Sequence, residues 1–238
     1  MRWVALSGLV VLAVAAAGAS PSGGQSASGC PATLANQLAS TGQATQLITV
    51  VTAGYRSTHG TLRLWRKAGN GCWRPVTGPW WAWVGGRGVS DHKREGDRTT
   101  PTGAYGFGRV MYGTAPNPGV HYPYHRVVCG DWWVEDPASP SYNRFRHVPC
   151  GSTPPFRTTS EDLSRSPTAY RHFAVIAYNS NPIVPGRGSG IFLHVSTGRP
   201  TLGCVSLSLP RLVTTLRWLR PSPSPLIVIG TAAEVRQF

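Results

Sequence analysis

Two side chains in the C-terminal third of the chain have the types and spacing for nucleophilic chemistry. Cys204 lies in the stretch Thr201–Ser206, and His194 precedes it by ten residues at the end of an apolar run. A free thiol is mostly protonated at neutral pH, so a nucleophilic cysteine needs a base or a cation beside it. Gly203 allows close approach of a substrate, and the N–H groups of Gly203 and Cys204 can form an oxyanion hole. The spacing alone also fits a buried structural cysteine and a hydrogen-bonded histidine.

The cysteine count supports a free thiol in an exported protein. Met1–Arg2 is a charged start, a short apolar run follows, and Ala17–Ala19 supplies small residues for cleavage. These features predict a signal peptide over residues 1–19, a Ser/Gly-rich linker over 20–29 and a folded domain over 30–238. We therefore expect a secreted or cell-wall-associated protein. Five cysteines in such a protein indicate two disulfides and one cysteine left over.

The charge of the chain indicates an anionic surrounding. With 23 basic and 9 acidic residues, the formal net charge is +14. Such a charge attracts polyanions, and both nucleic acid and an anionic cell envelope qualify. The basic residues are mostly scattered singly, and no nucleic-acid-binding motif is present. We expect retention near the anionic envelope and no nucleic-acid partner.

The elements that must position Cys204 and His194 are mainly strands. Abundant Gly (28) and Pro (21) disfavour a helical bundle and favour short strands joined by turns. Leu209–Leu219 is the clearest helix, with Ser208 as its cap and Pro210 in its first turn. We expect a mainly β protein with one or two short helices and a loop over 85–103. The expected strands are 46–52, 60–67, 80–84, 105–111, 172–178, 190–194 and 226–229.

Several segments, in order, resemble the L,D-transpeptidase catalytic domain of actinobacterial type. Gly188–His194 followed by Thr201–Val205 is similar to the family's His strand, spacer and Ser/Thr-x-Gly-Cys motif. Residues 94–103 (REGDRTTPTG) resemble its G-D-x-x-T-P-x-G segment, which we expect to be a turn before a strand. Residues 131–136 (DWWVED) and 141–143 (SYN) resemble a further segment. The resemblance covers roughly residues 46–230 and implies an L,D-transpeptidase-like β-sandwich.

The resemblance implies a two-step acyl transfer on peptidoglycan stem peptides, with no cofactor and no metal. Cys204 would attack the carbonyl between the third and fourth residues of a tetrapeptide stem, and D-alanine would leave. His194 would take the thiol proton or hold an ion pair with the thiolate. An amine of a neighbouring stem would then attack the thioester to form a cross-link. The group that orients His194 would be the Val195 carbonyl or the Ser196 hydroxyl.

Other polar and aromatic residues are weaker candidates. Ser206 occupies a position where many family members have Arg or Asn, and Leu202 one where many have a second His. The spacer between His and Cys is also shorter than in many members. We expect substrate contacts from Ser206, Tyr178, Asn179 and Tyr142, although aromatic residues here can equally fill a small β core. The acidic and histidine residues of 91–97 are expected to form a solvated loop, because they lack a metal-ligand spacing.

If Cys204 is the nucleophile, four cysteines remain for two disulfides. Four cysteines allow three pairings. We favour Cys30–Cys72 and Cys129–Cys150, which leave Cys204 reduced. We expect a monomer. Two other functions remain open: an L,D-carboxypeptidase that uses water at the same site, and a non-enzymatic wall-binding module.

Overall fold

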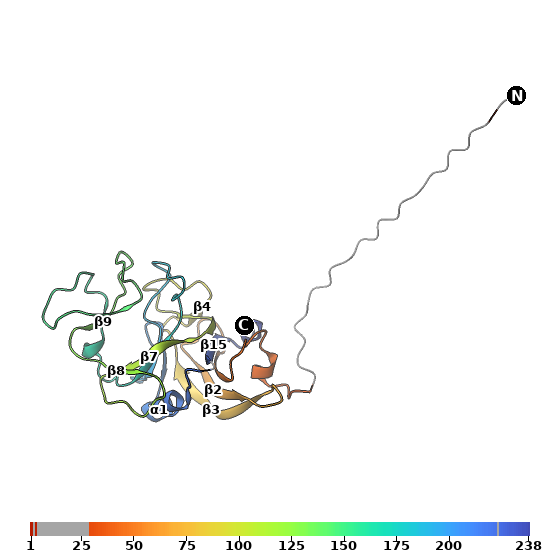
Figure 1. Ribbon diagram of the computed structural model, residues 1–238, viewed down its shortest axis with the longest axis horizontal. Coiled ribbons are helices and arrows are strands. Elements are labelled where there is room, and N and C mark those ends of the chain that lie inside the picture. The colour runs from red at the N-terminus through yellow and green to blue at the C-terminus, as the bar shows by residue number, and fades with distance from the viewer. Residues whose placement is uncertain (2, 4–28, 223) are drawn as a thin grey trace.

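The computed structural model describes residues 1, 3, 29–222 and 224–238, and its folded part is mainly β (Figure 1). Ten strands form one sheet in the order β6-β15-β1-β2-β3-β14-β13-β12-β7-β8. Their bounds are β1 Gln46–Thr52, β2 His59–Lys67, β3 Trp73–Trp83, β6 Gly103–Tyr105, β7 Phe107–Gly113, β8 Tyr124–Arg126, β12 Phe173–Ile176, β13 Phe192–Val195, β14 Val205–Leu207 and β15 Leu226–Thr231. The predicted fold class is confirmed.

The large sheet curls around its main hydrophobic core. Leu62 of β2 and Met111 of β7 stand several strands apart in the sheet order, yet both belong to this one buried cluster. Helix α1 (Leu209–Trp218) contributes Leu212 and Leu216 to the same cluster. Strands that share one core across such a separation must face each other, which gives the layered, sandwich-like arrangement.

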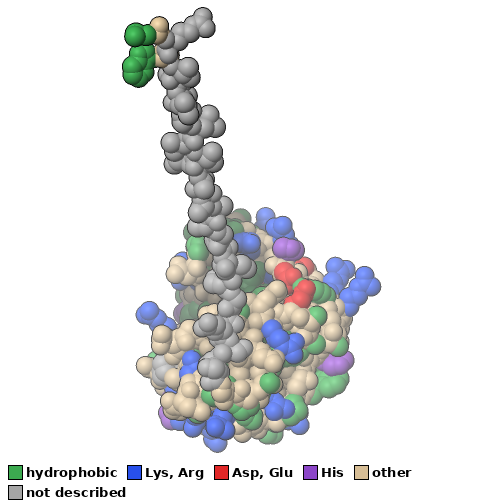
Figure 2. Space-filling model, turned by 90° about the vertical axis from the view of Figure 1, so that its right-hand side faces the viewer, with side chains coloured by type: hydrophobic (Ala, Val, Ile, Leu, Met, Phe, Trp, Pro, Cys, Tyr) green, Lys and Arg blue, Asp and Glu red, His purple; other side chains and the backbone are tan. Residues whose placement is uncertain are grey.

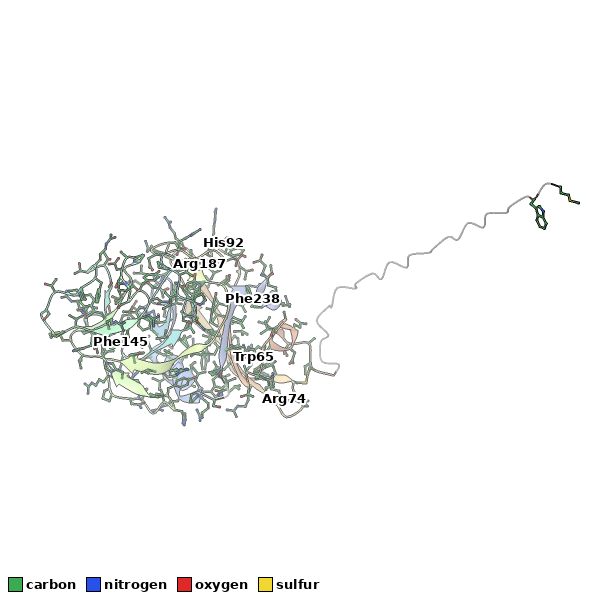
Figure 3. All side chains as sticks on the ribbon, turned by 45° about the horizontal axis from the view of Figure 1, so that its top comes forward. Trp65, Arg74, His92, Phe145, Arg187 and Phe238 are labelled. Atoms are coloured by element: carbon green, nitrogen blue, oxygen red, sulfur yellow. A yellow bond between two sulfur atoms is a disulfide. The ribbon has the colours of Figure 1, made fainter. Side chains whose placement is uncertain are left out.

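A second, smaller layer covers the other face of the central strands. It contains a three-stranded sheet of β10 (Phe145–His147), β9 (Asp131–Trp133) and β11 (Glu161–Asp162). Phe173 and Phe192 point toward this layer, and the ring of Trp133 meets that of Phe192 edge-on at 5.1 Å. In Figure 3, Phe145 marks this end of the molecule, while Trp65 and Arg74 mark the β2–β3 hairpin at the other end.

The structure refines several predicted elements. The run 80–84 is the end of the longer strand β3, and 105–111 is split at Gly106 into β6 and β7. The predicted loop 85–103 contains the short paired strands β4 (Val89–Ser90) and β5 (Thr100–Pro101) and the start of β6. Strand β14 was not predicted, because three residues are too few for a periodic signal. Ser208 is the N-cap of α1, but its side chain makes no capping hydrogen bond.

One disulfide joins the N-terminal segment to the β2–β3 hairpin, and a second closes a loop within the smaller layer. Cys30 bonds to Cys72 and Cys129 bonds to Cys150, which leaves Cys204 free. Most of the predicted signal peptide and nearly all of the predicted linker lie outside the described residues. Within the part that the structure describes, no helix has the length and hydropathy to cross a membrane.

The packing of α1 generates a stability prediction. Leu216 is fully buried in the main core, whereas Leu202 is 70% exposed. Leu216→Ala removes buried methyl groups and leaves a cavity, so we expect a loss of about 2–5 kcal/mol in the free energy of unfolding. Leu202→Ala is the matched control and should change it by less than about 0.5 kcal/mol. Urea unfolding followed by tryptophan fluorescence measures both, and equal losses would contradict the assigned packing.

Candidate active site

Parallel pairing of two short strands brings the thiol and the imidazole to the same face of the sheet. In the register of β13 with β14, Leu193 pairs with Val205 and His194 with Ser206. Leu193 and Val205 point into the main core. Because side chains alternate along a strand, His194 points to the opposite face, which is also the face of Phe192. Cys204 directly precedes β14 and joins Phe192 in the cluster on that face.

The thiol of Cys204 is buried and hydrogen-bonded to the backbone. Cys204 as a whole is only 8% exposed to solvent. The N–H of Phe192 donates to Sγ at 3.3 Å, and Sγ donates to the carbonyl of Gly190 at 3.2 Å. Burial raises the pKa of the thiol to about 12; the carboxylates of Glu161 and Glu135 add to this, and the Phe192 N–H and the Lys93 ammonium oppose it. In the absence of substrate, Cys204 is therefore a neutral thiol.

His194 is a buried, neutral imidazole held in one tautomer. Its Nδ1 lies 2.9 Å from the carbonyl oxygen of Val195, and a carbonyl can only accept, so Nδ1 carries the proton. Nε2 is then free of a proton and can act as a base. Burial lowers the pKa of His194 to about 4, although the carbonyls of Val195 and Ala169 favour the charged form. The Ser196 hydroxyl instead accepts from the Gly198 N–H.

The aromatic ring of Tyr170 completes the surroundings of the pair. It meets the His194 ring edge-on at 5.7 Å between centroids and lies in the same buried cluster as Cys204. Burial raises the pKa of its hydroxyl, and the charges of Cys204, Glu161 and Glu135 add to this shift. Tyr170 therefore contacts the base and lies among the groups that set the charge around the nucleophile. The sequence carried no signal for this residue, because it stands alone in a loop far from both motifs.

The Thr-Pro segment is part of the support of the nucleophile as well as a turn. Thr100 Oγ1 donates to the carbonyl of Cys204 at 3.2 Å, and Thr201 Oγ1 donates to the same carbonyl at 2.7 Å. Gly203 adopts φ +145°, and a Cβ there would lie 2.9 Å from the carbonyl oxygen of Thr99. Gly203 is thus required by close backbone approach. Its N–H donates to Thr201 Oγ1 at 3.1 Å, so a substrate oxyanion must share or replace this bond.

Cys204 and His194 open into a cavity of about 850 Å³ with charges of both signs on its walls. This volume suits a peptide-sized ligand. The basic lining residues are Lys93, Arg98, Arg165 and Arg199, and the acidic ones are Glu95, Glu135 and Glu161. The cavity therefore offers partners for both carboxylate and ammonium groups close to the thiol.

Two glutamates of the smaller layer lie beside the nucleophile. Burial raises the pKa of Glu135 to about 8, with Glu161 and Glu95 adding to the shift, and burial also raises the pKa of Glu161. A Cβ on Gly190 would lie 2.4 Å from Glu135 Oε1, so this carboxyl lies against the residue whose carbonyl accepts the Cys204 thiol hydrogen bond. Perturbed carboxyl groups in a cavity are typical of functional sites. The sequence could have suggested Glu135 through the DWWVED patch but gave no reason to choose Glu161.

Lys93 is a buried cation at the other side of the thiol. Its Nζ forms an ion pair with Asp97 at 2.6 Å and donates to the carbonyl of Arg94 at 3.0 Å. Nζ would lie 3.4 Å from a Cβ on Gly203, so its charge stands next to the residue that precedes the nucleophile. A buried ammonium is costly unless it is paired, and Asp97 supplies that partner.

The four residues expected to contact substrate are not among the residues that line the cavity. Tyr142 hydrogen-bonds to Glu95 and accepts from the Gly188 N–H, and Asn179 Nδ2 donates to the carbonyls of Val184 and Gly188. Tyr178 donates to the carbonyl of Arg187. These bonds hold the loop before β13. None of the three, nor Ser206, is among the cavity-lining residues, and their contact with substrate stays a prediction.

Ser206 occupies an unusual place. It is almost fully buried and pairs with His194 across β13 and β14. Its hydroxyl has no hydrogen-bond partner among the described residues.

The acidic loop of residues 91–97 makes turn hydrogen bonds. Asp97 accepts from the N–H groups of Arg94 and Thr99, and Asp91 accepts from Thr102. Across residues 29–222 and 224–238, no group of three or more His, Cys, Asp and Glu side chains is arranged to hold a metal ion.

Comparison with known protein families gives one match. The sequence model of the YkuD family, described as the L,D-transpeptidase catalytic domain, matches residues 39–229. This span contains all the residues named above for the cavity. No curated protein and no solved structure gives a significant match.

The environment of the thiol generates a prediction about its titration. Since burial raises the pKa of Cys204 to about 12, the reactive thiolate should be scarce at pH 7 and still increasing above pH 10. We expect the rate of alkylation by iodoacetamide to rise through pH 10 without reaching a plateau. Cys204→Ser is the control and should not be labelled, because the other cysteines form disulfides. A plateau below pH 8.5 would mean that the unliganded site holds a thiolate.

Proposed function

The chain belongs to the L,D-transpeptidase catalytic-domain family, which acts on peptidoglycan, and we propose that it forms cross-links between stem peptides with Cys204 as nucleophile. The observation that carries the proposal is that a free thiol and a neutral imidazole line one cavity. The proposed donor is a tetrapeptide stem that is cut between its third and fourth residues.

In the proposed first step, the base acts as the thiol attacks. Because both groups are neutral before reaction, His194 Nε2 takes the thiol proton while Sγ bonds to the scissile carbonyl carbon. The hydrogen bond from Nδ1 to the Val195 carbonyl keeps this tautomer and also stabilises the imidazolium that forms. The imidazolium then protonates the departing nitrogen, D-alanine leaves, and a thioester on Cys204 remains.

The second step reverses these roles. An amine of a neighbouring stem attacks the thioester, His194 takes a proton from that amine, and the thiol is restored when the new amide forms. Water at the same position would give hydrolysis. No feature among the described residues favours water over an amine, so the cross-linking reaction is proposed from the family.

The charged lining of the cavity supports a donor with groups of both signs. D-alanine carries a carboxylate one residue from the scissile bond, and the Lys93 ammonium next to Gly203 is a suitable partner for it. A diamino acid at the third position carries an ammonium, for which Glu135 and Glu161 are partners. An ammonium bound there would favour the ionised forms of Glu135 and Glu161, whose pKa values burial raises.

Two disulfides indicate an extracellular or periplasmic setting, since such bonds persist in oxidising compartments. We propose export through the signal peptide over residues 1–19 and action as a monomer. Basic side chains are scattered over the face shown in Figure 2, and the net charge of +14 supports retention near an anionic wall.

Removal of either member of the pair tests the proposed reaction. Cys204→Ala should abolish the covalent route, and His194→Ala should lower kcat about 10²–10⁴-fold, because proton transfer is lost. The assay is incubation of residues 30–238 with tetrapeptide muropeptides and mass analysis of products. A Cys204-dependent dimer supports transpeptidation, whereas tripeptide without dimer supports a carboxypeptidase. No turnover by wild-type protein with intact disulfides would point to a non-enzymatic wall-binding module.

The acid limb of the pH profile tests the role of His194. The base must be unprotonated to accept the thiol proton, and burial lowers its pKa to about 4. We therefore expect kcat/KM to stay near its maximum as the pH falls from 7 to 5.5 and to fall only below about pH 5. A solvated histidine would instead give a loss centred near pH 6.5. The control is the pH dependence of peptide binding to Cys204→Ala. If kcat/KM falls near pH 6.5 while peptide binding does not change there, His194 is not a buried neutral base.

A further inference from the structure

The outer face of β2 and β3 carries three aromatic rings that the proposed reaction does not use. His59 and Trp81 are stacked, with ring centroids 3.9 Å apart and an interplanar angle of 11°. Trp83 stands perpendicular to both, at 6.2 Å from His59 and 5.5 Å from Trp81. Trp81 is nonetheless 50% exposed. We call these three side chains the aromatic patch.

The aromatic patch is a preformed platform. One face of the Trp81 indole is covered by His59, and the edge contacts of Trp83 fix both rings, so the other indole face is presented to solvent in a set orientation. Rigid aromatic side chains bind at a low cost in conformational entropy. A contiguous exposed group of aromatic rings, unlike a single exposed side chain, is typical of an interaction site.

Cross-strand pairing connects the aromatic patch to His194. Across neighbouring strands, His59 pairs with Trp83, Trp83 with Ser206, and Ser206 with His194. Residues paired in this way point to the same face of a sheet. Two strand spacings of about 4.8 Å put Trp83 roughly 10 Å from His194.

One loop forms a wall that the aromatic patch and the catalytic cavity share. The Thr201 N–H donates to the carbonyl of Val84, the residue after Trp83, at 2.9 Å. Thr201 and Leu202 of the same loop line the cavity, and Leu202 is exposed at its rim. This loop therefore connects the cavity wall to the residue that follows Trp83 of the aromatic patch.

On its other side the aromatic patch borders a second hollow. This hollow, of about 460 Å³, is lined by Thr61, Arg63 and Thr52 among others. Thr61 pairs with Trp81 across β2 and β3. Thr61 and Arg63 supply this hollow with polar groups that can hydrogen-bond to a ligand.

We propose that the aromatic patch and the hollow bind sugar rings of the glycan strand whose stem peptide occupies the catalytic cavity. The apolar face of a pyranose packs on an indole, while its hydroxyl groups bond to side chains such as Thr61 and Arg63. The length of the stem peptide fits this distance. The scissile carbonyl belongs to the third stem residue, and three extended residues span about 10 Å back to the sugar, which matches the separation of Trp83 from His194. The inference rests on the proposed function for the identity of the polymer.

The test compares two donors that differ only in the sugar. Wild-type protein should process a disaccharide-tetrapeptide with a kcat/KM about ten-fold above that of the free tetrapeptide, through a lower KM. Trp81→Ala should remove this advantage, Trp81→Phe should keep part of it, and kcat should not change. Val76→Ala, at an exposed site elsewhere on β3, is the control and should behave as wild type. Equal kinetics of the two donors in wild type, or equal losses on both in Trp81→Ala, would overturn the inference.

Two measurements separate this inference from the proposed reaction and from folding. The first is acylation of Cys204 by a carbapenem, followed by mass spectrometry, which needs the nucleophile but no sugar. The acylation rate should be equal in wild type and Trp81→Ala. A lower rate in the variant would mean that Trp81 supports the fold. Titration of Cys204→Ala with chitotetraose, followed by the indole NMR signals, needs no turnover. Shifts of the Trp81 signal support the glycan site even if the cross-linking proposal fails, and the absence of any shift overturns it.

Discussion

The parallel pairing of β13 with β14 is the constraint on which the site depends. These two short strands sit in the middle of the ten-stranded sheet, and their register decides which side chains face the core and which face the cavity. Because side chains alternate, a slip of one residue would turn His194 into the core and Leu193 into the cavity. The core residues Leu193, Val195, Val205 and Leu207 resist such a slip, so hydrophobic burial on one face fixes the chemistry on the other.

Burial makes the catalytic pair neutral and therefore sets its mode of action. The same desolvation that raises the pKa of Cys204 lowers that of His194, so each group is in its uncharged form over a wide range of pH. An ion pair between them would have to overcome both penalties before substrate arrives. The carboxyl groups of Glu135 and Glu161 oppose a thiolate further. In such a site, charge develops at sulfur as the new bond forms, and a cationic group of the substrate can compensate for it.

The smaller layer and the loops complete the cavity around this sheet. Strands β9 and β11 pair Trp133 with Glu161, and Trp133 packs on Phe192 beside the thiol. The Cys129–Cys150 disulfide closes this layer, and Tyr142 with Glu95 ties the 93–97 loop to the segment before β13. Tyr142, Tyr178 and Asn179, expected from sequence to touch substrate, hold loops in place, while the charged cavity wall includes Glu95, Arg98 and Glu135 from the two upstream motif segments.

The sequence by itself determined the mainly β class, the free cysteine and the two motif residues. These follow from local features: turn-rich composition, β-branched runs, an odd cysteine count and the His and Gly-Cys spacing. Tertiary structure decided the rest. Separate segments bring Glu135, Glu161, Lys93 and Tyr170 to the cavity. The β3–β14 pairing places Trp83, and with it Trp81, in line with Ser206 and His194. Local patterns record what a segment buries, but the register between distant strands depends on the packing of the whole core, which no single segment specifies.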